Sequence, residues 1–364
     1  MALKIGIIGL PNVGKSTLFN ALTKTRGAQA ANYPFCTIEP NVGIVEVPDM
    51  RLRALAELVH PEKIVPAAIE FVDIAGLVKG ASQGEGLGNA FLSHIREVDA
   101  LCHVVRVFEG GDILHVEGSV DPKRDRETIE TELMLADLQT VQKRLDKSRN
   151  AARTGDKEKI LEVAVCEKYA KALEQGLPAR TVSLLPEEEP VAHGLHLLTR
   201  KPLLYCANVA EDQLQSLDPA TLQSRMQLPP EDELVLISAK IEEDLQDLSA
   251  TDAAEFLQSL GVSSSGLDRL IHAAYQALGY ITYFTAGIQE VRAWNVLKGS
   301  TAPQAAGVIH TDFERGFIRA ETIAYKDFVQ YGGESKAKEA GKMRAEGKDY
   351  IVQDGDILHF RFNV

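Results

Sequence analysis

Near its N-terminus the chain reads Gly9-Leu10-Pro11-Asn12-Val13-Gly14-Lys15-Ser16-Thr17. This stretch matches G-x-x-x-x-G-K-S/T, the pattern of a phosphate-binding loop. The apolar run Ile5–Ile8 before it predicts a buried parallel strand, and Ser16–Leu22 after it predicts an amphipathic helix. A glycine-rich turn between strand and helix points successive N–H groups and the helix N-terminus at an anion. The sequence therefore predicts a nucleotide phosphate site in an α/β domain.

The residues of this loop have different expected roles. Lys15 would reach the β- and γ-phosphates and take part in catalysis, and the Ser16 hydroxyl would bind Mg²⁺. We expect the loop as a whole to bind the nucleotide through Asn12, Val13, Gly14, Lys15, Ser16 and Thr17.

Composition limits the classes of protein that fit. The 364 residues are enough for two or three domains. The net charge of −13 argues against non-specific electrostatic binding of nucleic acid by the chain as a whole. No apolar run is long enough to span a bilayer, and Met1–Lys4 leaves no room for a signal peptide, so we expect no membrane partner. Single, scattered cysteines suggest neither a disulfide framework nor a zinc site, and they fit a reducing cytoplasm; they are Cys36, Cys102, Cys166 and Cys206.

Apolar runs and helical patterns alternate from Lys4 to about Asp125. Such alternation predicts a mostly parallel sheet with helices on both faces. We expect the strands of this sheet at residues 4–8, 42–47, 68–72, 101–105, 202–207 and 234–237, and its closing helix at residues 266–278.

The segment 126–175 interrupts this pattern. Apolar residues step by three or four through two stretches on either side of the polar loop Arg153–Asp156, which predicts a helical hairpin or short coiled coil. Residues 143–159 hold seven basic and three acidic side chains, for which a solvated helix face is the favoured interpretation. Residues 176–190 are expected to be a linker. The helical insertion would then occupy 126–197, inside an α/β domain made of 1–125 and 198–279.

The last part of the chain, 280–364, predicts a separate small domain. Glycines divide it into short strand-like runs, and Asp354-Gly355 predicts a turn before the final strand. Residues 336–348 contain five basic and two acidic side chains, which makes a second local basic patch.

A second motif, Asp73-Ile74-Ala75-Gly76, follows an apolar strand. A carboxylate at the end of a strand can hold the hydration shell of Mg²⁺, and the Gly76 N–H can meet a γ-phosphate oxygen, which gives Gly76 a catalytic role. Thr37 lies between the two motifs in a loop-like stretch, where its hydroxyl could complete the Mg²⁺ shell. The alternative is that Thr37 is a turn residue.

The expected base-binding motif is unusual. Standard GTPases carry Asn-Lys-x-Asp, whose aspartate accepts two hydrogen bonds from guanine, but this chain reads Asn208-Val209-Ala210-Glu211. The lysine is missing and the carboxylate is longer, so the guanine contact should be weakened or lost. We expect Asn208, Val209 and Glu211 to contact the nucleotide, with Ser238 beside the base edge after the last strand.

With these motifs the chain resembles the YchF group of Obg-like ATPases, a branch of the translation-factor-like P-loop NTPases. The resemblance spans essentially the whole chain. It implies a preference for ATP over GTP, a cytoplasmic location, association with ribosomes and a C-terminal TGS domain of the ubiquitin-like β-grasp type. It is carried by 12–22, 32–41, 73–89, 208–211, 284–294, 302–318 and 340–356.

The group that orients the attacking water is less evident. Many related NTPases place a glutamine after Asp-x-x-Gly, but this chain has Leu77, which cannot orient water. The resemblance points to His115 instead, because a histidine can accept a hydrogen bond from water and titrates near neutral pH. From the residues alone, a structural histidine at a loop–helix junction is favoured. In related NTPases with this loop, the residue equivalent to Asn12 helps hold K⁺, so K⁺ is a further hypothesis.

Three functions remain open at this stage. The first is an ATPase that hydrolyses ATP to ADP and phosphate with Mg²⁺ and acts as a ribosome-binding, monomeric switch. The second is an Obg-class GTPase with a degenerate base motif. The third is a non-catalytic, nucleotide-sensing adaptor for RNA or protein.

Overall fold

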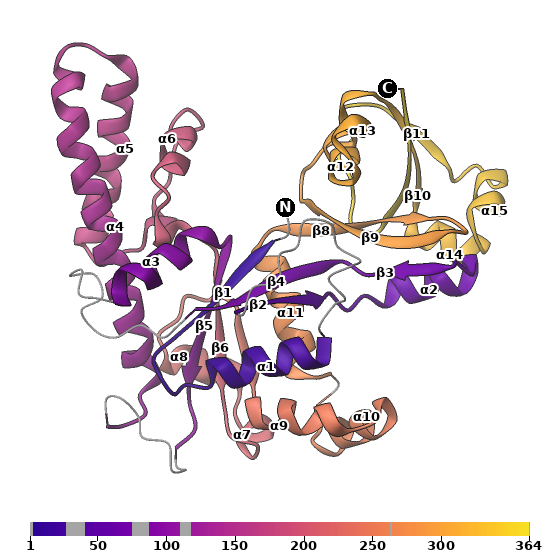
Figure 1. Cartoon of the computed structure of the whole chain (residues 1–364), viewed down its shortest axis with the longest axis horizontal. Helices are drawn as coiled ribbons and strands as arrows, with labels where there is room; N and C mark the ends of the chain where they lie inside the picture. Colours follow the sequence, from indigo (N-terminus) through magenta and orange to yellow (C-terminus); the bar gives the residue numbers. More distant parts are fainter. Residues whose placement is uncertain (1–2, 27–40, 75–86, 110–117, 263, 364) are drawn as a thin grey trace.

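The computed structural model describes residues 3–26, 41–74, 87–109, 118–262 and 264–363. Two six-stranded sheets organise these residues (Figure 1). Four positions of interest, Thr37, Gly76, Leu77 and His115, lie outside the described residues.

The first sheet is mostly parallel, as predicted. Its strand order is β2-β4-β1-β5-β6-β7, and every neighbouring pair is parallel except the edge pair of β2 and β4. The predicted strand positions are confirmed to within two residues at either end. The strands are β1 (Lys4–Ile8), β2 (Val42–Glu46), β4 (Ala68–Asp73), β5 (Ala100–Arg106), β6 (Leu203–Asn208) and β7 (Leu234–Ile237).

Helices cover this sheet because its central strands are apolar on both faces. All seven residues of β5 are buried, which requires packing on each side. The predicted closing helix is confirmed as α11. The helices of this part are α1 (Lys15–Arg26), α2 (Met50–Val59), α3 (Leu87–Glu97), α7 (Gln213–Ser216), α8 (Pro219–Arg225), α9 (Ala239–Asp244), α10 (Ala250–Ser259) and α11 (Gly266–Ala277).

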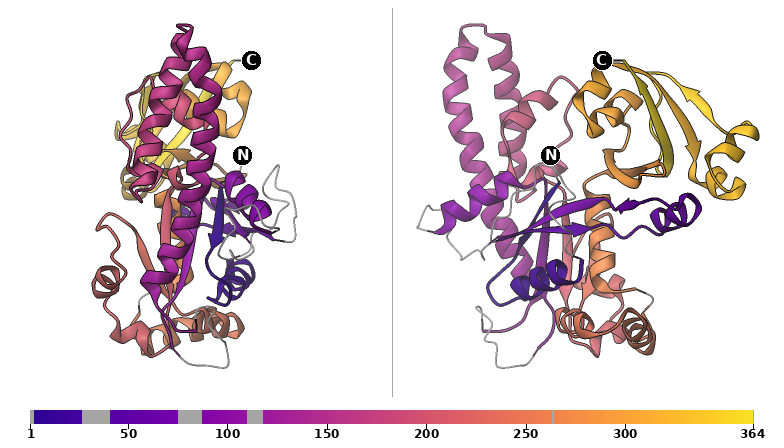
Figure 2. Two further views of the ribbon diagram at one scale, coloured as in Figure 1. Left: turned by 90° about the vertical axis from the view of Figure 1, so that its left-hand side faces the viewer. Right: turned by 45° about the vertical axis from the view of Figure 1, so that its right-hand side comes forward.

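A helical hairpin leaves the sheet between β5 and β6 (Figure 2). It consists of α4 (Pro122–Arg153) and α5 (Lys157–Glu174), and Asp121 and Asp156 cap the two helices through their side chains. The hairpin has an apolar core of its own, in which Val141 and Tyr169 are fully buried. The predicted hairpin is present, and its first helix begins four residues earlier than expected.

The prediction of a linker at 176–190 is wrong. This segment contains the short helix η3 (Ala179–Thr181) and runs into α6 (Glu189–Gly194). Glu188, within this segment, is only 4% exposed, and its carboxylate accepts a 2.7 Å hydrogen bond from Lys168 of α5. Because this ion pair and the buried Ala179 hold the segment against the hairpin, it packs there instead of connecting freely.

The second sheet has the order β11-β10-β12-β8-β9-β3. Its strands are β8 (Tyr280–Ala286), β9 (Glu290–Leu297), β10 (Phe317–Ala324), β11 (Arg344–Glu346) and β12 (Asp356–Phe362). The predicted Asp-Gly turn precedes β12, with Gly355 at φ 88°. The accompanying helices are α12 (Ala302–Ile309), α13 (Thr311–Arg315), α14 (Tyr325–Tyr331) and α15 (Glu334–Glu339).

One strand of the second sheet comes from the first half of the chain. β3 (Lys63–Val65) lies between β2 and β4 in sequence but pairs in parallel with β9. Nearby, the Asn295 side-chain amide of β9 donates a 2.9 Å hydrogen bond to the carbonyl of Ala68 at the start of β4. The sequence did not predict this joint between the two sheets.

An arginine reinforces the joint. Arg51 of α2 donates to Asp354 at 2.6 Å and to Asp49 at 2.8 Å, and its guanidinium lies 5.2 Å from the ring centre of Phe284. Asp354 in turn accepts a 3.0 Å hydrogen bond from the backbone N–H of Thr282. One guanidinium therefore ties α2 to the turn before β12 and to β8.

Two further findings concern the cysteines and the hydropathy of the helices. Cys102, Cys166 and Cys206 are buried free thiols, and Cys102 and Cys206 lie in neighbouring strands of the first sheet, as expected for small apolar residues. In the described ranges, no helix is both long and apolar enough to cross a membrane.

We expect Arg51→Ala to lower the free energy of unfolding by about 1–2 kcal/mol, because it removes charge-assisted hydrogen bonds that are partly exposed. Urea unfolding followed by circular dichroism measures this loss. Arg53→Ala is the matched control, because Arg53 is an exposed arginine on the same helix. Equal effects of the two substitutions would contradict a specific role of Arg51.

Candidate functional site

The phosphate loop connects β1 to α1 through a backbone that only glycine can follow at two points. Gly9 has φ 151° and Gly14 has φ 99°. A Cβ atom on Gly9 would lie 2.4 Å from the carbonyl oxygen of Val104, and one on Gly14 would lie 2.3 Å from Nδ2 of Asn208. Both positions therefore require glycine for two reasons: a Cβ atom would collide with neighbouring atoms, and the positive φ disfavours other residues. Asn12 also has a positive φ, 65°, at the tip of the loop.

Lys15 lies over the loop with its side chain almost completely buried. It is 7% exposed, and its Nζ donates a 2.8 Å hydrogen bond to the carbonyl of Leu10. Burial lowers the pKa of this ammonium group, and the nearby negative charge of Asp73 partly opposes the shift. A desolvated ammonium at the start of a helix suits an anionic ligand such as a nucleotide phosphate.

Ser16 and Asp73 meet at the end of the loop although 57 residues separate them. The Ser16 hydroxyl donates a 3.0 Å hydrogen bond to Oδ2 of Asp73. Ser16 comes from the first turn of α1 and Asp73 from the end of the neighbouring strand β4, so the parallel pairing of β1 and β4 brings them together. Two hard oxygen donors at this point fit Mg²⁺, which also accepts phosphate oxygens as ligands. Within the described ranges, no cluster of three or more His, Cys, Asp or Glu residues could hold a metal ion. Phosphate or water oxygens would therefore have to complete the ligands of Mg²⁺ here.

Asn208 links the phosphate loop to the segment after β7. Its side-chain Nδ2 donates to the carbonyl of Val13 at 3.0 Å, and its Oδ1 accepts from the N–H of Ala239 at 3.1 Å. The residue is 5% exposed. Both ends of its amide are thus used within the protein, so Asn208 fixes the phosphate loop relative to the start of α9.

The remaining base-motif residues differ in exposure. Val209 is 2% exposed and packs in the apolar core with Tyr205 and Leu222, which leaves its backbone as the part nearest a ligand. Glu211 is exposed, so its carboxylate is free to meet a ligand from solution. Ser238 is 2% exposed at the N-cap of α9.

Gln213 is a member of this region that sequence reasoning missed. Its side-chain oxygen accepts a 3.0 Å hydrogen bond from the N–H of Ala210 and so fixes the turn that carries Glu211. The four-letter base motif gives no signal for it, because it lies two residues beyond the motif.

Glu242 is a second residue that the sequence did not reveal. It is 4% exposed on α9, and its Oε1 accepts a 2.7 Å hydrogen bond from the N–H of Gly266 at the start of α11. Burial raises the pKa of Glu242 to about 7, although the backbone donors of Gly266 and Leu267 work in the opposite direction. This carboxyl group therefore anchors the helix that follows Ser238 to the closing helix of the sheet.

Comparisons with known proteins agree with this geometry. Residues 4–148 match the family model described as 50S ribosome-binding GTPase, and residues 280–363 match that of the C-terminal domain of YchF GTPases, described as a protein of unknown function. A protein of Bacillus subtilis, named ribosome-binding ATPase YchF, is 56% identical over 369 residues, with both chains fully covered. This chain belongs to the YchF family.

Other YchF proteins match along the same length. A ribosome-binding ATPase YchF of Escherichia coli O157:H7 is 54% identical with full coverage of both chains. The solved structure of the Schizosaccharomyces pombe YchF GTPase has a TM-score of 0.88 and 42% identity, covering 99% of this chain and 97% of that one. A GTP-binding protein from Pyrococcus horikoshii, at 21% identity and a TM-score of 0.63, shares the fold. The YchF similarity thus includes the hairpin and the second sheet.

We expect the stability of the chain to contain a pH-dependent contribution from Glu242. The folded carboxyl has a pKa of about 7 against an ordinary value of 4.5, so between these values the folded state holds the extra proton and stability falls as pH rises. Relative to the wild type, Glu242→Gln should therefore gain about 2–3 kcal/mol in free energy of unfolding between pH 4.5 and pH 8.

Urea unfolding across this pH range measures the difference. Glu243→Gln, an exposed neighbour on the same helix, is the control and should follow the wild type at every pH. A constant difference between Glu242→Gln and the wild type would rule out the raised pKa.

Proposed function

We propose that this chain hydrolyses ATP to ADP and phosphate with Mg²⁺ and acts as a nucleotide-dependent switch that binds the ribosome. The observation that carries the proposal is the arrangement of Lys15, Ser16 and Asp73 around one loop. Lys15 is desolvated at the start of α1, and Ser16 and Asp73 are in contact at 3.0 Å. The names of the B. subtilis and E. coli relatives support both the ATPase activity and the ribosome as partner.

The phosphate contacts follow from the loop. Backbone N–H groups from Asn12 to Thr17 and the Lys15 ammonium would bind the α-, β- and γ-phosphates. Gly76 and Thr37, which lie outside the described residues, would meet the γ-phosphate side and make their segments sensitive to hydrolysis. This sensitivity is what would make the ATPase a switch.

Magnesium would be held by Ser16 and Asp73, with Thr37 completing the set. Bound there, Mg²⁺ would neutralise charge on the β- and γ-phosphates. K⁺ beside Asn12 would add further positive charge, and equal turnover in Na⁺ and K⁺ would contradict that role.

We further propose a division of labour along the chain. Residues 1–125 and 198–279 would form the nucleotide domain, 126–197 the helical insertion, and 280–364 the TGS domain. The ribosome, an RNA-rich partner, would be met by the basic stretches 143–159 and 336–348, because the chain as a whole is acidic. Such a protein would work as a cytoplasmic monomer.

The base preference rests on three residues. Asn208 is committed to Val13 and Ala239, and Val209 is buried, so neither side chain replaces the lysine of a guanine-binding motif. Glu211 is one methylene longer than the aspartate that pairs with guanine N1 and N2. These features favour adenine, whereas the descriptions of the GTPase family model and of the S. pombe structure favour guanine as the competing assignment.

We expect the wild type to bind ATP more tightly than GTP and Glu211→Asp to narrow that preference about tenfold, because a charge-assisted hydrogen bond contributes about 1.5–3 kcal/mol. Isothermal titration with each nucleotide measures both affinities. Glu211→Ala is the control, since it removes the longer carboxylate without providing the shorter one. Tighter binding of GTP by the wild type would assign the chain to the Obg-class GTPases.

We expect His115→Ala to lower kcat for ATP hydrolysis by about a hundredfold while ATP affinity stays within about twofold, because general base catalysis contributes about that much. Lys15→Ala should instead weaken both binding and turnover. Single-turnover assays with and without ribosomes measure the effect. Unchanged kcat in His115→Ala would remove this residue from catalysis, and no hydrolysis by the wild type in either assay would favour a nucleotide-sensing adaptor.

A further inference from the structure

The second sheet separates into two parts between β8 and β12. Only Ile357 of β12 is paired with Phe284 of β8, although β8 continues to Ala286 and β12 to Phe362. β8 stays paired with β9 along its whole length, and β12 stays paired with β10. Because the two ladders diverge, the end of β12 has no paired strand on its β8 side within the described residues.

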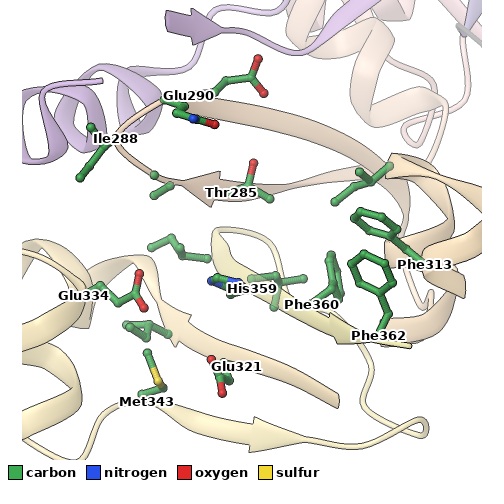
Figure 3. Close-up of a pocket in the computed structure, with 17 residues that line it drawn as sticks. Thr285, Ile288, Glu290, Phe313, Glu321, Glu334, Met343, His359, Phe360 and Phe362 are labelled. Atoms are coloured by element: carbon green, nitrogen blue, oxygen red, sulfur yellow. The ribbon is translucent and has the colours of Figure 1, made fainter. Parts of the chain in front are cut away.

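A cavity of about 600 Å³ occupies this opening (Figure 3). Phe313 and Phe362 lie at one end, and Met343 and Glu334 lie toward the other. The rings of Phe313 and Phe362 stack, with their centres 3.8 Å apart. The β8–β9 turn with Ile288 forms the facing wall. Most of the lining side chains are apolar, and the volume lies within the range of natural ligand pockets.

Three glutamates line the cavity, Glu290, Glu321 and Glu334. Glu290 is paired with Arg292 at 3.9 Å, and Glu321 with Arg319 at 3.1 Å and Arg361 at 2.9 Å. Glu334 is exposed, and no ion pair to it occurs within the described ranges. Glu334 is therefore the lining carboxylate that is left to meet a basic group of a ligand.

We propose that this cleft binds an extended polypeptide segment with alternating apolar and basic side chains, which adds as a strand to the free edge of β12. A bound strand of about five residues would form backbone hydrogen bonds with residues 358–362 of β12. The apolar side chains would enter the cavity near Phe362 and Met343, and a basic side chain would meet Glu334. This site lies in the C-terminal part of the chain and does not depend on nucleotide turnover.

The test uses the full chain and a fluorescein-labelled decapeptide that alternates lysine and valine. Fluorescence anisotropy should give saturable binding at physiological salt, at least tenfold tighter than for a decapeptide that alternates glutamate and valine. Glu334→Gln should weaken binding at least threefold. Glu339→Gln is the matched control, because it removes the same charge from an exposed position on the same helix outside the cavity.

Amide hydrogen exchange locates the bound peptide. Saturating lysine–valine peptide should slow exchange in residues 356–363 and leave the hairpin of α4 and α5 unchanged, which general attraction to an acidic protein would not do. Equal effects of Glu334→Gln and Glu339→Gln, or unchanged exchange in β12, would overturn the proposal. So would protection of β12 from exchange by an oligouridine of twelve nucleotides alone, which would assign the cleft to RNA. Protection of β12 that rises with protein concentration alone would assign it to a second copy of this chain.

Discussion

The amide of Asn208 joins the phosphate loop to the segment after β7. One end donates to the carbonyl of Val13, and the other accepts from the N–H of Ala239. Gly14 lies so close to this amide that any side chain there would displace it. The relative positions of the loop and of the start of α9 therefore depend on one buried group. Glu242 extends this fixation by tying the following helix to α11.

Local patterns predicted much of this site. The spacing of Gly9, Gly14 and Lys15 and the apolar runs of the strands specify a phosphate loop at the end of a parallel sheet, because both depend on neighbouring residues only. The sequence assigns Ser16 and Asp73 to one Mg²⁺ ion, and the parallel pairing of β1 and β4 brings the two side chains together. The role of Glu242 could not be predicted, since it depends on the N–H of Gly266, which tertiary packing brings near. Gln213 contacts a neighbour in sequence, Ala210, but it lies outside the base motif.

Nonlocal pairing explains the other failures. β3 is three residues long, and its Lys63 and Ile64 are exposed, so neither length nor alternation distinguishes it from a loop. Its partner, β9, comes more than two hundred residues later in the sequence. The segment 176–190 is predicted as a linker for a related reason, because only the folded hairpin places Lys168 against Glu188. Sequence periodicity reports which face of an element is apolar, but not which distant residue will cover it.

The pairing of β3 with β9 has a consequence for the synthesis of the chain. β3 emerges from the translating ribosome more than two hundred residues before its partner. At about 5–20 residues per second, it waits on the order of ten to fifty seconds with an unpaired edge. During that time Arg51 of α2 also lacks Asp354, one of the two aspartates that it binds. The last strand of the first sheet, β7, ends at Ile237, so all strands of that sheet are made while β3 is still unpaired. The nascent chain therefore carries an unpaired strand edge until β9 is synthesised.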